Sequence, residues 1–450
     1  MRVARSRWPQ TTGVDRWNPN DKVPTGRRAR RTVTQAMDQT ADERGLRVVP
    51  WRSSALYVIL ASSLMGVMGV SLISPVLPDL RAVFDVTDAQ VGLVITAFTL
   101  PGIFFTPFVG LLADRFGRRR TIIPLLFTFG IAGAGVAFAE TFTQVLALRF
   151  VQGLGASALV TLAVTLIGDL YDERQRDAVM GLNGSTLGTG AALYPFIGGA
   201  LAAVRWSAPF LFFGVGILVG VLATVALREP DGRQSMAARA YLNRLQAVIV
   251  LPRAIAIFTA IFVVFFVFYG AVLTALPLLL SDEFGLRASQ IGPVLAMVAL
   301  ASAVVSSQYG WLSEWRTAPE LVALGFVAAG TSLLCVWLAP SPVLIGASLL
   351  LFGVGFGILM PAIDTSVITL VAAELRAGMM GLRTSMLRLG QTLGPVGFTF
   401  VAEAAFVSTI DGYRTLILLA GSVVALGGIV LYLSLRRGTF RSVSQTTDRR

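Results

Sequence analysis

Histidine is absent from this 450-residue chain, and cysteine occurs once, as Cys335. Without an imidazole, the chain has no histidine general base, no Ser–His–Asp triad and no histidine ligand for a metal. A single thiol forms neither an internal disulfide nor a thiolate metal site. The sequence also lacks a nucleophile motif, so it argues against an enzyme and predicts neither a metal nor a cofactor.

Charged residues are also scarce. Asp, Glu, Lys and Arg make up 14% of the chain, hydrophobic residues reach 55%, and the mean hydropathy is +0.73. Soluble domains carry about a quarter charged residues. A bilayer crossing needs about 20 apolar residues, and a helix satisfies its own backbone groups there. Several long segments contain no charge at all: Thr121–Ala139, Ala178–Val204, Trp206–Leu227, Ala254–Ser281, Ala288–Ser313 and Leu321–Ile363.

This composition predicts an all-α polytopic membrane protein with twelve transmembrane helices. A basic disordered arm is expected at 1–52, a linker at 228–253 and a tail at 436–450, which leaves two six-helix halves at 53–227 and 254–435. Met37 is an alternative start, in which case residues 1–36 are absent from the mature chain. The crossings are expected near 53–78, 89–112, 121–139, 142–168, 178–204, 206–227, 254–280, 288–312, 321–338, 343–369, 378–403 and 413–435.

Basic residues are distributed unequally between the two sets of loops. Thirty Lys and Arg residues fall in the termini and in the loops on the same side, and the opposite loops hold Arg81, Arg205, Arg287 and Arg414. Loops rich in Lys and Arg stay in the cytoplasm. We therefore expect a multi-pass protein of the plasma membrane with both termini cytoplasmic. The net charge of +12 reflects this topology, and because it is scattered between helices we expect no nucleic-acid partner.

The sequence repeats itself at an offset of 200 residues. Gly153 and Gly155 fall on glycines 200 positions later, and "MGLNGSTLGTGAALYP" (Met180–Pro195) aligns with "MGLRTSMLRLGQTLGP" (Met380–Pro395). The offset spans six crossings, an even number, so the two halves insert with the same orientation. Halves of this kind are typical of one class of transporter, in which the substrate site lies between the halves near the bilayer midplane.

Four motifs together resemble a known family. They are "GLLADRFGRRR" (Gly110–Arg120) between helices two and three, "RFVQGLGA" (Arg149–Ala156) in helix four, "GVSLISPVLPDL" (Gly69–Leu80) at the end of helix one, and Gly181, Gly190, Pro195, Gly198 and Gly199 in helix five. Over about residues 53–435 the chain is similar to the major facilitator superfamily, and most similar to its drug–proton antiporter branch. One departure is Tyr194, where that branch has a glycine; this tyrosine is expected to crowd the packing face of helix five.

The resemblance implies a secondary active transporter that exports small molecules against an inward proton flow by alternating access. The expected partners are a small-molecule substrate, protons and the lipid bilayer, and the expected state is a monomer. Three intramembrane arginines favour lipophilic substrates that are neutral or anionic. Tyr194, and the lack of an acid deep in helix one, keep open a metabolite or sugar facilitator or symporter of the same fold. A transporter-like sensor or scaffold is an alternative of a different class, although both tails are short.

The loop between helices two and three is expected to form a gating latch. A carboxylate at a helix end can accept hydrogen bonds from the free N–H groups of a neighbouring helix. The resemblance implies that Asp114 does this to helix eleven, and that Arg118 pairs with an acid at the foot of helix four, here Asp169. These contacts would hold the halves closed on the cytoplasmic side; a simple topology anchor is the alternative. The rest of the latch motif is Gly110, Gly117 and Arg119.

Ionisable residues inside the apolar segments are functional candidates, because an unpaired charge there costs several kcal/mol. Arg149 lies about seven residues, roughly 10 Å, inside helix four, and the resemblance connects it with proton coupling. Snorkelling to the surface is the alternative. Asp79 and Asp364 are further candidates for the proton-binding residue. Asp364 and Arg383 are expected at similar depth, where a purely structural ion pair is an equally good interpretation.

The substrate cavity is expected near the midplane, and Arg388 is the candidate nearest to it. The aromatic run "IFVVFFVFY" (Ile261–Tyr269) in helix seven is expected to line an apolar part of this cavity or to contact lipid. The residues that we expect to line the cavity are Arg388, Arg383, Asn183, Gln152 and Gln391.

Overall fold

The structure is a computed structural model that describes residues 48–229, 252–370 and 376–436. The chain divides into a first unit, Met1–Val49, and a helical unit, Pro50–Arg450. The expected basic arm, linker and tail fall largely outside the described ranges. All of the regular structure in the described part of the chain is helical.

The first half contains six successive helical spans, several of them built from more than one element. Their elements, in chain order, are α2 (Ser54–Ser71), η2 (Ser74–Val76) and α3 (Leu77–Phe84); α4 (Asp88–Phe116); α5 (Arg118–Gly135) and η3 (Val136–Phe138); α6 (Phe142–Ala156) and α7 (Leu159–Leu170); α8 (Glu173–Val204); and α9 (Ala208–Phe212) with α10 (Val215–Ala226).

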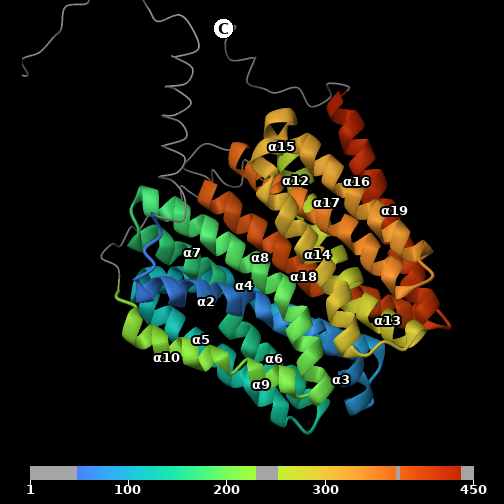
Figure 1. Cartoon of the computed structure of the whole chain (residues 1–450), viewed down its shortest axis with the longest axis horizontal. Coiled ribbons are helices and arrows are strands. Elements are labelled where there is room, and N and C mark those ends of the chain that lie inside the picture. The colour runs from blue at the N-terminus through green and yellow to red at the C-terminus, as the bar shows by residue number, and fades with distance from the viewer. Residues whose placement is uncertain (1–47, 230–251, 371–375, 437–450) are drawn as a thin grey trace, which may run out of the picture. The chain divides into compact units, whose positions relative to one another are not determined.

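The second half repeats this plan. Its elements are α12 (Pro252–Val267), η4 (Phe268–Ala275) and α13 (Leu276–Phe284); α14 (Ala288–Ser307) and α15 (Tyr309–Trp315); α16 (Ala318–Leu338); α17 (Pro342–Thr369); α18 (Arg376–Ala405); and α19 (Thr409–Arg436). Figure 1 shows these helices packed as one bundle, with α4, α8, α14 and α18 in its middle.

Eleven of the spans in the described part are long and apolar enough to cross a membrane. The twelfth is α18, whose hydropathy is lowered by Arg383, Arg388 and Glu403. At 30 residues it is nevertheless longer than the roughly 20 residues that a crossing requires. The predicted all-α membrane fold with twelve helices is thus supported.

We call the end of the bundle that carries residues 85–87, 139–141, 285–287 and 339–341 the outer end, and the opposite end the inner end. These names follow the predicted orientation. Helices begin at the outer end with capping boxes: Thr87 Oγ1 accepts from the Gln90 N–H at 3.3 Å, and Gln90 Oε1 accepts from the Thr87 N–H at 2.8 Å. Thr141 and Gln144 repeat this arrangement at the start of α6.

The 200-residue repeat is visible in the packing of equivalent glycines. Gly153 of α6 lies against the backbone carbonyl of Phe98, and Gly353 of α17 lies against the carbonyl of Val298, exactly 200 residues later in both partners. The first helix of each half also ends in the left-handed conformation at equivalent positions, with φ of 49° at Asp85 and 64° at Gly285. The two halves therefore have matching internal packing.

The halves meet through two equivalent helix pairs, α4 with α18 and α8 with α14. In the first pair, Gly92 of α4 leaves room for the Thr399 side chain. In the second pair, Gly292 of α14 leaves room for the Pro195 carbonyl of α8. Small residues allow the backbones to approach closely, which is how helices associate in lipid.

Several spans depart from regular α-helix, and three of these departures bear on the site. The first span breaks at Leu72–Val76, the fourth breaks at Ser157 and Ala158, and the seventh contains the π-helix η4. The irregular segments of spans one and seven touch, because Ser74 Oγ donates to the Leu273 carbonyl at 2.5 Å. Irregular backbone at membrane depth is tolerated where protein covers it or where it lines a cavity.

We predict that Gly153→Ala and Gly353→Ala each destabilise the protein by about 1–3 kcal/mol, because the new Cβ meets a backbone carbonyl that cannot move aside cheaply. Gly168→Ala is the matched control: it also lies within a helix, but a Cβ there meets nothing within 4 Å. The measurement is thermal unfolding in detergent. Equal midpoints for all three variants would contradict the packing argument.

Candidate functional site

The outer end of the bundle is closed by an ion-pair network that joins the halves. Arg81 of α3 lies 2.5 Å from Asp88 Oδ1 of α4, and its guanidinium also forms a two-pronged ion pair with Asp282 of α13. Asp88 in turn accepts a hydrogen bond of 2.9 Å from the Tyr413 hydroxyl of α19. Figure 1 shows α3 and α13 beside each other at this end.

The network is largely withdrawn from solvent. Tyr413 is fully buried and Asp88 is 5% exposed, so charge-assisted hydrogen bonds here are stronger than in water. Glu403 of α18 adds a further contact between the halves by accepting from the Ala89 N–H at 2.8 Å. A second arginine, Arg414, pairs with Glu283, but both belong to the second half. The first arginine thus connects the halves and the second does not.

Contacts between the halves decrease toward the inner end. Along the α14-facing stripe of α8, a Cβ on Gly199 meets the Ala288 backbone, and one on Gly188 meets only the Ala303 methyl at 3.8 Å. Further in on the same stripe, a Cβ on Gly184 or Gly181 meets no described atom within 4 Å. The two helices therefore diverge toward the inner end.

The pair α4 and α18 behaves in the same way. Thr96 Oγ1 donates to the Thr392 carbonyl at 3.0 Å, and the Arg388 side chain lies against Gly102, where a Cβ would meet Nε at 3.0 Å. Seven residues further toward the inner end of α18, a Cβ on Gly381 meets nothing within 4 Å. Within the described residues, the halves are closed at the outer end and separated at the inner end.

Arg388 is the innermost contact between α4 and α18 that the described residues show. It is half-buried, its Nη1 donates to Gln391 Oε1 at 3.1 Å, and its Nη2 lies 3.5 Å from the Ser157 carbonyl at the break in the fourth span. Gln391 Nε2 donates to the Tyr269 hydroxyl at 2.8 Å. Two of the predicted cavity residues are therefore together, and they contact the π-helix of span seven.

Arg149 is fully buried within the first half. Its guanidinium donates to the Val94 carbonyl at 3.2 Å, to the Gly69 carbonyl at 2.7 Å and to Gln152 Oε1 at 2.7 Å. The ring centroid of Phe98 lies 4.4 Å from the guanidinium carbon, a cation–π distance. Arg149 thereby connects spans one, two and four, and it does not snorkel to the surface.

Asp364 and Arg383, both predicted as candidates, form an ion pair between α17 and α18. The Asp364 side chain is 37% exposed and that of Arg383 is 16% exposed, so the carboxylate is the more accessible partner. Tyr309 at the start of α15 donates to Thr365, the neighbour of Asp364, at 3.2 Å. The pair lies on the inner side of Arg388, where the halves are separated.

The predicted latch is only partly described. Arg118 Nε lies 2.9 Å from Asp169 Oδ2, an ion pair that joins α5 to the end of α7 within the first half. Gly117 has a φ of 105°, which only glycine adopts readily, and Arg119 donates to the Thr224 carbonyl at 2.7 Å. The side chain of Asp114, the environment of Gly110 and residues 371–375, which precede α18, lie outside the described residues.

The inner end of the first half is held by a further pair near this loop. The hydroxyls of Tyr171 and Ser53 lie 3.3 Å apart, which connects the end of span four to the start of span one. Burial raises the pKa of Tyr171 above its ordinary value, so this hydroxyl stays neutral. In the second half Glu314, the equivalent of Asp114, is exposed.

Residues of the helix-five motif pack against both halves of the protein. Gly198 lies against the Leu72 carbonyl at the break in span one, and Gly199 against Ala288 of the other half. Tyr194 is only 6% exposed, and its ring occupies the space beside Gly190. Pro195 presents its carbonyl to Gly292. At Gly181, by contrast, an added Cβ would meet no described atom within 4 Å. The Tyr194 ring is thus accommodated beside Gly190, one turn earlier in the same helix, because that glycine has no side chain.

The remaining predicted residues are dispersed. Asn183 of α8 is 3% exposed and its Oδ1 has no hydrogen-bond partner among the described atoms; the same holds for Gln152 Nε2. Asp79 lies in the first turn of α3, close to the outer end. No described residue brings these three together with Arg388.

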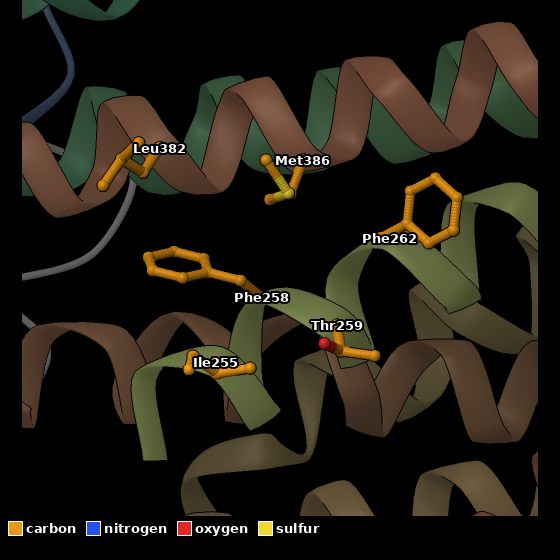
Figure 2. Close-up of a pocket in the computed structure, with 6 residues that line it drawn as sticks. All are labelled: Ile255, Phe258, Thr259, Phe262, Leu382 and Met386. Carbon is orange, nitrogen blue, oxygen red and sulfur yellow. The ribbon is translucent and has the colours of Figure 1, made fainter. Parts of the chain in front are cut away.

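An apolar crevice of about 310 Å³ opens between α12 and α18 near their inner ends. Figure 2 shows Phe258 and Phe262 of α12 facing Leu382 and Met386 of α18, with the Thr259 hydroxyl as a polar group beside them. The aromatic run of span seven therefore has two surroundings. Phe262 lines this crevice, while other members of the run stack on α17, as Phe268 does with its centroid 4.8 Å from that of Phe356.

Sequence reasoning missed the outer network and Tyr269. In the sequence, Arg81 and Arg414 are visible only as loop charges, and no pattern singles out Asp88, Asp282 or Tyr413. Opposite charges at the outer ends of equivalent spans, Arg81 in the first and Asp282 in the seventh, were the available signal. Tyr269 gave no signal beyond its place at the end of an aromatic run.

Comparison with known proteins agrees with this architecture. The sequence profile of the Major Facilitator Superfamily matches residues 59–395 and, in a second match, 257–449. The bacillibactin exporter of Bacillus subtilis (strain 168) is 28% identical over 365 residues, 77% of this chain and 90% of the relative. The tetracycline resistance protein, class G, of Vibrio anguillarum is 27% identical over 386 residues, 83% of this chain and 96% of the relative.

Solved structures share the fold. A bacterial homologue of the human lysosomal transporter Spinster, inward-facing and unoccupied, superposes with a TM-score of 0.74 at 18% identity, covering 86% of this chain and 97% of that one. A D-xylose–proton symporter superposes with a TM-score of 0.68 at 14% identity, covering 82% and 96%. Together with the sequence match, these findings show that the chain belongs to the Major Facilitator Superfamily, with relatives in its drug–proton antiporter branch.

Proposed function

We propose that this protein is a proton-coupled exporter of small lipophilic molecules, neutral or anionic, working by alternating access. The observation that carries the proposal is the asymmetry of contacts between the halves, which are joined by ion pairs at the outer end and diverge at the inner end. Such an arrangement is one of the two states that a rocking transporter needs. The exporters and resistance proteins among its relatives support the direction of transport.

The orientation is part of the same proposal. Basic residues concentrate in the termini and in the inner loops, which favours a cytoplasmic inner end. The separated end then faces the cytoplasm, where an exporter takes up its substrate. The apolar lining of the crevice between α12 and α18 suits the lipophilic part of such a molecule.

For the proton we favour Asp364. Among the three candidates, Arg149 is held by two carbonyls and an amide within its own half, and Asp79 lies close to the outer end. Asp364 pairs with an arginine on the neighbouring helix and is exposed enough to exchange a proton. Protonation removes its charge and weakens the pair, which changes how α17 and α18 hold together on the inner side.

The direct test is transport by the purified full chain in liposomes, with and without an imposed pH gradient. The probes are dansyl glycinamide, dansyl glycine and ethidium, which are neutral, anionic and cationic. We expect the gradient to accelerate movement of the first two. If no probe responds to the gradient, or if ethidium alone does, the proposed function is wrong.

We predict that Asp364→Asn reduces the acceleration of probe transport by the pH gradient at least tenfold. Exchange of the probe without a gradient should continue. The neutral amide keeps the shape of the side chain but binds no proton. Asp79→Asn is the competing variant, tested in the same liposomes. Loss of coupling in Asp79→Asn with normal coupling in Asp364→Asn would assign the proton to the outer acid instead.

The outer network should act as the latch of this state. We predict that Asp282→Asn shifts the population toward outer opening by roughly 10- to 100-fold, because it removes a charged partner from Arg81 across the halves. The shift is measured as a longer distance between spin labels at Glu140→Cys and Val407→Cys, two exposed outer positions, in a Cys335→Ala background.

Glu283→Gln is the matched control for this experiment. It removes the neighbouring acid on the same helix, but its partner Arg414 belongs to the same half. We expect its distance distribution to match that of the parent protein. Equal shifts in both variants would mean that the effect comes from loss of outer charge in general and not from the bridge between the halves.

A further inference from the structure

The three intramembrane arginines differ in how their charge is compensated. Arg383 has a carboxylate partner in Asp364. Arg149 has carbonyl and amide acceptors at every guanidinium nitrogen, and two aromatic rings. Arg388 has neither arrangement: within the described part of the chain it contacts no carboxylate, and its buried Nε donates no hydrogen bond. It is the cation with free bonding capacity at the level where the halves meet.

The neighbours of Arg388 supply a second donor. Gln391 accepts from Arg388 through Oε1 and donates through Nε2 to the Tyr269 oxygen at 2.8 Å. Because the Tyr269 oxygen already accepts this bond, its own hydrogen is available to a further acceptor. The π-helix holds this residue in place, with Thr274 Oγ1 donating to the Tyr269 carbonyl at 2.7 Å. The Arg388 guanidinium and the Tyr269 hydroxyl, which Gln391 links, therefore both have a hydrogen to donate to a further acceptor.

The acceptor that Arg388 does reach in the other half is a poor one. Its Nη2 lies 3.5 Å from the Ser157 carbonyl, at the limit of a hydrogen bond, and that carbonyl already accepts from Thr106 Oγ1 at 2.8 Å. Gly102 leaves room for the arginine against α4. An oxyanion beside Arg388 would replace a weak, shared acceptor by a charge-assisted one, which gives arginine its preferred planar partner.

We propose that Arg388, Tyr269 and Gln391 form an anion-binding subsite that takes the carboxylate, or a similar oxyanion, of the transported molecule. This proposal rests on the proposed export function and narrows its substrate class from neutral or anionic compounds to organic anions. The apolar remainder of the substrate contacts the surrounding helices. Because Arg388 also touches the first half through Ser157, binding an anion there changes a contact between the halves.

The test is equilibrium binding and liposome transport of two probes that differ in one group, dansyl glycine with a carboxylate and dansyl glycinamide with a neutral amide. In the parent protein we expect dansyl glycine to bind at least tenfold more tightly. Arg388→Gln should remove that preference by weakening only the carboxylate probe, and Arg388→Lys should restore part of it. Tyr269→Phe should weaken dansyl glycine by about threefold to tenfold. Arg205→Gln, which removes an exposed outer charge, should leave the preference intact.

The outcomes separate the two proposals. If the pH gradient drives both probes equally and Arg388→Gln changes neither, export stands and the anion subsite is wrong. If Arg388→Gln weakens both probes to the same extent, the residue has a structural role and the subsite is likewise wrong. If the gradient moves neither probe but binding still shows the Arg388-dependent preference, the subsite stands and the export function fails.

Discussion

Every backbone group that leaves the helical pattern inside a membrane needs another partner, because hydrocarbon supplies none. This constraint bears directly on the breaks in spans one and four. The break in span one is held through Ser74, whose hydroxyl bonds the Leu273 carbonyl in the π-helix of span seven. The break in span four exposes the Ser157 carbonyl, which Thr106 and Arg388 approach. In these two spans, the irregular backbone is thus found where residues of the other half approach it.

Glycine packing and polar contacts have different roles in this bundle. Glycines such as Gly153 and Gly353 set the same internal packing in both halves, because each one meets a backbone carbonyl at the equivalent position. The polar contacts do not follow the repeat. Arg81 joins the halves through Asp282, while Arg414 at the same end stays within its own half. Symmetry therefore belongs to the glycine packing within each half, and asymmetry to the ion pairs at the outer end.

The environments of the three arginines show how position decides the use of one side chain. A guanidinium whose donors are all satisfied, as in Arg149, holds helices of one half together. A guanidinium paired with a carboxylate, as in Arg383, forms a contact that responds to protonation of Asp364. Within the described part of the chain, Arg388 has neither full satisfaction nor a counter-charge, and its Nη2 approaches the Ser157 carbonyl of the opposite half. These differences arise from neighbours that are distant in sequence.

The sequence by itself determined the fold class, the number of spans and the repeat. Hydropathy follows from the need to satisfy the backbone in lipid, and the offset of 200 residues follows from equivalent packing in the two halves. Both can be read along the chain without knowing which helices meet. The motifs also sufficed for the family. Sequence depth was enough to suggest Asp364 with Arg383, because two helices that run in opposite directions from one loop bring equal distances from that loop to equal depth.

Only the tertiary structure decided which side chains meet across the halves. Arg81 and Asp282, or Arg388 and Ser157, are about 200 residues apart, and their contact depends on how two six-helix units are placed against each other. The tertiary structure also decided that the guanidinium of Arg149 donates its hydrogen bonds to acceptors of its own half. A charge inside an apolar segment indicates that a partner is required. The identity of that partner depends on how the packed helices are rotated against each other, which no periodicity in the chain encodes.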